Sequence, residues 1–123
     1  MLINDGMTAF APNPGVSVLP VSGENDALLA ARLRSELANA VAGSAPVVVD
    51  LTDATSIDAT VVRILLEGLA ESEKREHLLL LLLPEDAASP VHRLFKLTGL
   101  AQLLPVVRSW DEALARAGRA PAA

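Results

Sequence analysis

Residues 46–60 have the sequence PVVVDLTDATSIDAT, and this stretch decides the fold class. The continuous apolar run from Val47 to Leu51 shows no alternation, which is typical of a short strand buried on both faces. The polar segment Thr52–Ile57 predicts a loop. The apolar spacing that follows predicts a helix over Val61–Glu73, whose inward face carries Val61, Val62, Leu65, Leu66 and Leu69. Strand, loop and helix in this order are typical of a crossover unit in an α/β domain.

The residues before this stretch predict one more strand and one more helix. Val16–Val21 has strand character, and Pro20 places the strand at a sheet edge or ends it. Gly23–Asp26 predicts a turn, from which Asp26 caps a helix that ends at Gly43. Apolar residues recur along that helix at every fourth position: Leu29, Leu33, Leu37 and Val41.

The residues after the stretch predict two strands and two helices. Leu78–Leu83 is a run of six leucines that ends at Pro84, and its length predicts a central strand rather than a helix. Ser89 and Pro90 begin a helix that ends at Gly99. Leu103–Val107 predicts a last short strand, and a capping box over Ser109–Glu112 begins the final helix, which runs to about Ala117.

Strands and helices therefore alternate along the whole chain, which predicts an α/β layer with parallel strand pairs and right-handed crossovers. We expect a single domain over residues 15–118, an irregular segment over residues 1–14 and a frayed tail over residues 119–123. A chain of 123 residues with 51% hydrophobic residues has the size and composition of one such domain.

Composition also argues against several classes of function. The chain has 10 Lys and Arg against 15 Asp and Glu, and a net charge of -5 disfavours binding to nucleic acid. Aromatic residues make up 2%, too few for surfaces that stack on bases or sugars. Without cysteine there is no disulfide and no thiolate zinc site. The apolar runs are too short for membrane insertion, so we expect a cytoplasmic protein.

Carboxylates and histidines offer little for catalysis. Asp50, Asp53 and Asp58 follow one predicted strand, an arrangement seen in magnesium sites and in ordinary helix caps. His77 and His92 are expected at exposed helix ends rather than in a metal site. No glycine-rich phosphate loop and no GxSxG motif is present. We therefore expect no enzyme and no cofactor, with a small enzyme that uses the three aspartates kept as an alternative.

Thr60 is the one hydroxyl in a position of interest. It lies near the start of the predicted helix, where unpaired N–H groups and the helix dipole stabilise a phosphate. The same position suits a hydroxyl or carboxylate that only caps the helix, and both interpretations stay open at this point.

The run from Val48 to Thr60 resembles the central motif of STAS domains, the anti-sigma factor antagonist family. In that motif a strand ends in Asp-Leu, and a short loop leads to Asp-Ser-Ser/Thr-Gly at the start of a helix. Three further segments resemble the family in order and spacing, and the resemblance covers residues 16–117: Gly23–Asp26, Leu97–Leu100 and Ser109–Leu114. The chain departs from the motif at Ala59 and Val61, which stand where the family has a serine and a glycine.

The resemblance implies a small, mixed, mostly parallel sheet with about four helices packed against it. It implies partner switching with an anti-sigma factor that has serine/threonine kinase activity and binds the ATP from which the phosphate comes. The matching phosphoacceptor is Thr60. The implied alternative is a non-phosphorylated scaffold subunit of a larger regulatory or lipid-transport assembly, and homodimerisation stays open.

The partner surface is expected where two loops meet at one end of the predicted strands. One loop is the Gly23–Asp26 turn, and the other runs from Ser56 into the first turns of the following helix. The predicted partner-binding residues are Asp26, Ser56, Asp58, Ala59, Thr60 and Arg63.

Overall fold

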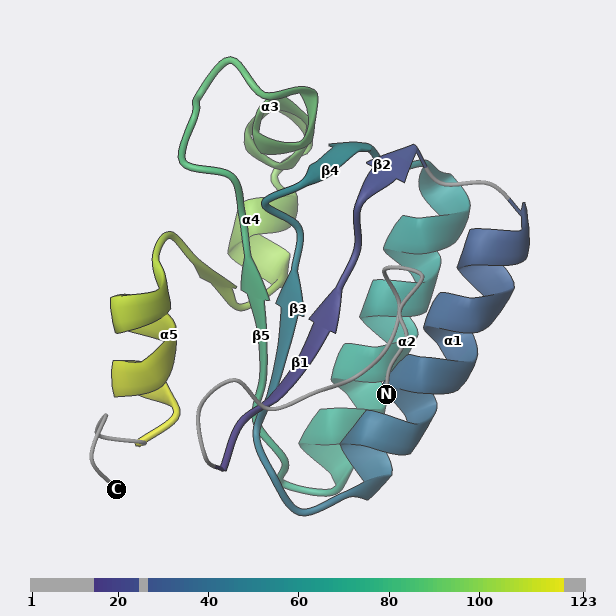
Figure 1. Cartoon of the computed structure of the whole chain (residues 1–123), viewed down its shortest axis with the longest axis vertical. Helices are drawn as coiled ribbons and strands as arrows, with labels where there is room; N and C mark the ends of the chain where they lie inside the picture. The colour runs from purple at the N-terminus through teal and green to yellow at the C-terminus, as the bar shows by residue number, and fades with distance from the viewer. Residues whose placement is uncertain (1–14, 25–26, 119–123) are drawn as a thin grey trace, which may run out of the picture.

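Strands β3 (Val47–Asp50) and β5 (Leu79–Leu82) form the centre of a four-stranded sheet. Strand β1 (Ser17–Pro20) pairs with β3, and β6 (Val106–Val107) pairs with β5, which gives the order β1-β3-β5-β6. All of these pairs are parallel, so the α/β fold class predicted from the sequence is confirmed. The computed structural model (Figure 1) describes residues 15–24 and 27–118, so the predictions for residues 1–14, Asp26 and residues 119–123 lie outside the described part.

Helices cover both faces of this sheet (Figure 1). Helices α1 (Ala27–Ala42) and α2 (Ala59–Lys74) pack side by side on one face, and α5 (Trp110–Arg116) lies on the other. Helices α3 (Pro90–Thr98) and α4 (Leu100–Leu103) follow β5 near the carboxyl ends of the strands. Within the described residues, no helix combines the length and the apolar character that crossing a membrane requires.

The leucine run explains why helices are needed on both faces. Leu79 and Leu81 belong to the larger apolar core with α1 and α2, whereas Leu80 and Leu82 belong to a second cluster with α5. All four side chains are at most 2% exposed. Because successive side chains of a strand point to opposite faces, an uninterrupted leucine strand is stable only between two apolar layers. The predicted central strand is therefore confirmed.

Helix ends follow the predicted capping signals closely. Ser89 precedes α3, Pro90 is its first residue, and Gly99 ends it with φ of 77° in the left-handed region. The Ser109 hydroxyl accepts a hydrogen bond from the Glu112 N–H at 3.0 Å, as expected for a capping box. The Glu112 carboxylate in turn accepts from the N–H of Arg108 at 2.9 Å. These local interactions are set by neighbouring residues, so the sequence shows them directly.

Two segments predicted as a turn and a loop are strands instead. Residues Gly23–Glu24 form β2 and residues Ala54–Ser56 form β4, and the two pair in parallel as a separate small sheet. Strands of two and three residues are too short to show alternation. Their pairing joins segments about thirty positions apart in the chain.

Two further predictions are corrected in the second half of the chain. The predicted strand Leu103–Val107 begins as helix α4, and only Val106–Val107 pairs as β6. Pro105 has no N–H to donate, although its carbonyl accepts from the N–H of Leu81 at 2.9 Å. In α2 the buried positions include Ile64, whereas Leu66 is 37% exposed.

Helices α1 and α2 approach closely at Gly68. A Cβ atom built on this glycine would lie 2.9 Å from Cγ of Leu37, which is buried on α1. An exposed ion pair between Arg34 and Glu67 joins the same two helices at the surface. Because Gly68 has no side chain, α2 can pack closely against Leu37 of α1.

The two-sided burial of β5 leads to a stability prediction. Leu80→Ala and Leu82→Ala remove methyl groups from a packed core, and each substitution is expected to cost about 2–5 kcal/mol of unfolding free energy. Leu103→Ala is the matched control, because Leu103 is 65% exposed. Chemical denaturation of the three variants measures the effect. If the Leu80 and Leu82 variants unfold at the same midpoint as the control, the two-sided burial of β5 is wrong.

Candidate functional site

The start of α2 is held by a side-chain cap on Asp58. Asp58 has an extended backbone, and its Oδ1 accepts a hydrogen bond from the Val61 N–H at 3.0 Å. Its carbonyl accepts the first intrahelical bond, from the N–H of Val62, also at 3.0 Å. The carboxylate is therefore committed to the helix N-terminus, where it also interacts favourably with the helix dipole.

Thr60 is the second residue of α2, and its side chain is exposed. The N–H groups of Ala59 and Thr60 precede the first intrahelical hydrogen bond, so they lie at the positive end of a 16-residue helix. Val61 is fully buried in the core. The side chain of Val61 therefore points into the core, and Thr60 beside it is exposed.

The small sheet brings the two predicted surface loops together. In the pairing of β2 with β4, Gly23 lies opposite Ala54 and Glu24 lies opposite Ser56. This predicted juxtaposition is confirmed, and Figure 1 shows the two strands beside the start of α2. Asp26 lies outside the described residues, so its place next to them stays a prediction.

We call the exposed residues around the start of α2 the switch surface. Arg63 lies on α2 one turn beyond Thr60, and buried Ile57 anchors the segment between β4 and the helix. The members of the switch surface are Ser56, Asp58, Ala59, Thr60 and Arg63, all exposed. Helix α3 contacts β4 from the other side, so this segment is packed in place rather than free.

Two of the three aspartates are engaged in local backbone interactions. The Asp50 carboxylate accepts hydrogen bonds from the N–H and the hydroxyl of Thr52, at 2.9 and 2.6 Å, and so closes a turn. Asp58 caps α2, as described above. Among the described residues there is no group of three His, Asp or Glu side chains placed to hold a metal ion.

The prediction that both histidines lie at exposed helix ends is wrong. His77 is half-buried, and its Nε2 is hydrogen-bonded to the carbonyl of Ala45. His92 is 8% exposed and lies on α3 among buried residues. Its position next to Val91 in the sequence does not reveal that the helix turns this side chain inward. The sequence therefore did not reveal that His92 is a buried polar side chain, nor that it lines a cavity beside α3.

A family model described as "Mlab, STAS domain" matches residues 8–105, most of the chain. The chain belongs to the STAS domain family. The matched region includes β3, β4, α2 and the whole switch surface. A search among curated proteins finds no match.

Solved structures of anti-sigma factor antagonists have a similar fold. An anti-sigma factor antagonist from Mycobacterium paratuberculosis is 28% identical, with a TM-score of 0.70 over 90% of this chain and 93% of that one. Unphosphorylated SpoIIAA, an anti-sigma factor antagonist, is 20% identical, with a TM-score of 0.69 over 89% of this chain and 93% of that one. Phosphorylated SpoIIAA from Bacillus is 18% identical, with a TM-score of 0.64 over 89% and 96%.

The cap on α2 leads to a second stability prediction. Asp58→Ala removes the acceptor for the Val61 N–H and is expected to lower the free energy of unfolding by about 1 kcal/mol. Asp58→Ser retains an oxygen that can accept the same bond, so it should be nearly neutral. Thermal or urea unfolding of the two variants measures the difference. Equal stability of the alanine and serine variants would show that the cap contributes nothing.

Proposed function

We propose that this STAS protein is an anti-sigma factor antagonist that acts by partner switching and is controlled by phosphorylation of Thr60. The observation that carries the proposal is the position of Thr60, an exposed hydroxyl at the positive end of α2 within the family's central motif. The 28% identical structure is itself described as an anti-sigma factor antagonist, which supports the same role here.

The chemistry of the switch surface suits a reversible phosphate. Phosphorylation adds about −1.5 to −2 charges, and the unpaired N–H groups of Ala59 and Thr60 stabilise that charge locally. The domain should therefore remain folded when Thr60 is modified. A partner that packs against the neutral hydroxyl would instead have to desolvate a dianion beside the exposed Asp58 carboxylate. Phosphorylation would thus release the partner without unfolding the domain.

The proposed partner is an anti-sigma factor with serine/threonine kinase activity, which binds ATP and transfers its phosphate to Thr60. Ala59 supports this assignment, because it leaves Thr60 as the single hydroxyl in the first turn of α2. In this proposal the protein is a binding partner and a substrate, with no catalytic role of its own. The commitment of Asp50 and Asp58 to a turn and a cap argues against the alternative of a small enzyme.

The first functional prediction concerns Thr60 itself. Thr60→Asp should abolish binding to the anti-sigma factor, because the carboxylate places a negative charge at the interface. The melting temperature should change little. Thr60→Ala should bind but should accept no phosphate from the kinase. Ser35→Asp, an exposed position on α1, is the matched control for added charge. Calorimetry and phosphate incorporation from labelled ATP measure the two effects.

Two results would overturn the phosphorylation switch. One is equal affinity of wild type, Thr60→Ala and Thr60→Asp for the partner. The other is normal labelling of Thr60→Ala. Either result would favour the non-phosphorylated scaffold, in which the same surface binds its partner without being released by phosphorylation.

The second functional prediction concerns Arg63. Its side chain is exposed one turn beyond Thr60, so Arg63→Ala should weaken partner binding without lowering the melting temperature. Arg93→Ala, which changes another exposed arginine, on α3, is the control and should bind like wild type. Binding curves of both variants, measured with the same preparation of partner, give the two affinities to be compared. An unchanged affinity for Arg63→Ala would remove this residue from the interface.

A further inference from the structure

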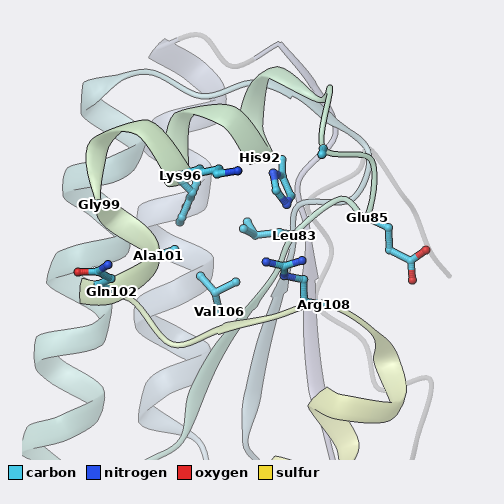
Figure 2. A pocket seen from close by; sticks show the side chains of 11 residues that line it. Leu83, Glu85, His92, Lys96, Gly99, Ala101, Gln102, Val106 and Arg108 are labelled. Atoms are coloured by element: carbon cyan, nitrogen blue, oxygen red, sulfur yellow. The ribbon is translucent and has the colours of Figure 1, made fainter.

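A pocket of about 360 Å³ lies between α3, α4 and the carboxyl end of β6. Its lining includes the apolar residues Leu83, Ala101 and Val106 together with the cations Lys96 and Arg108 (Figure 2). This size falls within the range of small-molecule sites, which are mostly apolar with a few convergent polar groups. No residue of the switch surface lines this pocket.

His92 provides a buried polar atom that points to a ligand. The residue is 8% exposed and lines the pocket, and its Nδ1 is buried with no hydrogen-bond partner. Among the side chains that the structure describes, it is the one buried nitrogen or oxygen in this condition. Since buried polar groups are almost always satisfied, an unpartnered nitrogen in the wall of a cavity favours a bound group that completes it.

Two cations from different elements face the same space. Figure 2 shows the ammonium of Lys96, from α3, and the guanidinium of Arg108, after β6, on the two sides of the His92 ring. Neither side chain forms an ion pair within the described part of the chain. The carboxylate of Glu85 also belongs to the lining, but Figure 2 shows it directed away from the other side chains. The pocket is thus locally cationic in a chain of net charge -5.

We propose that this pocket binds a small amphipathic acid, a molecule with an apolar body and one carboxylate or phosphate head. The body would lie against Val106, Ala87 and Ala101, the apolar lining residues with accessible surface, where it loses contact with water. The head would accept hydrogen bonds from Lys96 and Arg108, of which the guanidinium suits a two-oxygen anion. The His92 ring would turn its buried, unpartnered Nδ1 toward the same head and, in the tautomer that carries the proton there, donate to it. The apolar wall and the cations together select this class over an inorganic anion or a neutral hydrocarbon.

The test titrates the full-length chain with octanoate, octyl phosphate and octanol, and follows backbone amide shifts by NMR. At least one of the two acids should shift the amides of residues around the pocket and bind about tenfold or more tightly than octanol, because charged hydrogen bonds are strong. The comparison of the two acids decides between a carboxylate and a phosphate head. Equal affinity for octanol and both acids, or no binding of either acid at millimolar concentration, would overturn the proposal.

Matched variants localise the site and separate charge from burial. Arg108→Gln and Lys96→Gln should each weaken acid binding about tenfold. Arg93→Gln should not, because Arg93 is exposed on α3, the helix of Lys96, but lies outside the pocket. His92→Phe should remain folded, since it buries an apolar ring in place of an unpartnered nitrogen, and should lose the preference for acids over octanol. Loss of affinity in Arg93→Gln equal to that in Arg108→Gln, or an unchanged preference in a folded His92→Phe, would overturn the site. Because the binding assay needs no partner, its outcome does not depend on the proposed switch at Thr60.

Discussion

Burial of β3 and β5 on both faces is the constraint on which the rest of this structure depends. Their side chains are almost entirely apolar, so helices must cover the sheet on both sides. All strands run parallel, and each crossover therefore has to return over a face of the sheet. The consequence is that the carboxyl ends of all four strands lie at one edge, where α/β domains place their functional loops.

Both candidate sites of the molecule lie at that edge. The switch surface follows β3 through β4 and α2, and the pocket lies beyond the ends of β5 and β6. Helix α3 belongs to both neighbourhoods, because it contacts β4 and also contributes His92 and Lys96 to the pocket. The two sites differ in charge chemistry. At α2 the helix dipole would stabilise an added phosphate, whereas the pocket holds full positive charges on side chains.

Local signals in the sequence determined much of the fold and the centre of the candidate site. The unbroken apolar runs predicted the two buried strands, and the caps at Ser89 and Ser109 predicted where two helices begin. Thr60 and Asp58 were placed at the start of α2 by the same kind of evidence. These features depend on residues a few positions apart, so they can be predicted from the sequence without knowing the fold.

Tertiary structure alone decided the remaining features, because each depends on residues distant in the chain. Strands β2 and β4 exist through their pairing with each other, and neither has a sequence pattern of its own. The inward rotation of His92 is set by how α3 packs against β4 and α4, and the cavity beside it needs Arg108 from beyond β6. The sequence by itself therefore determined which segments are strands and helices at the core and that Thr60 lies at the start of α2. Only long-range packing decided which polar side chains are buried together and what binding surfaces they form.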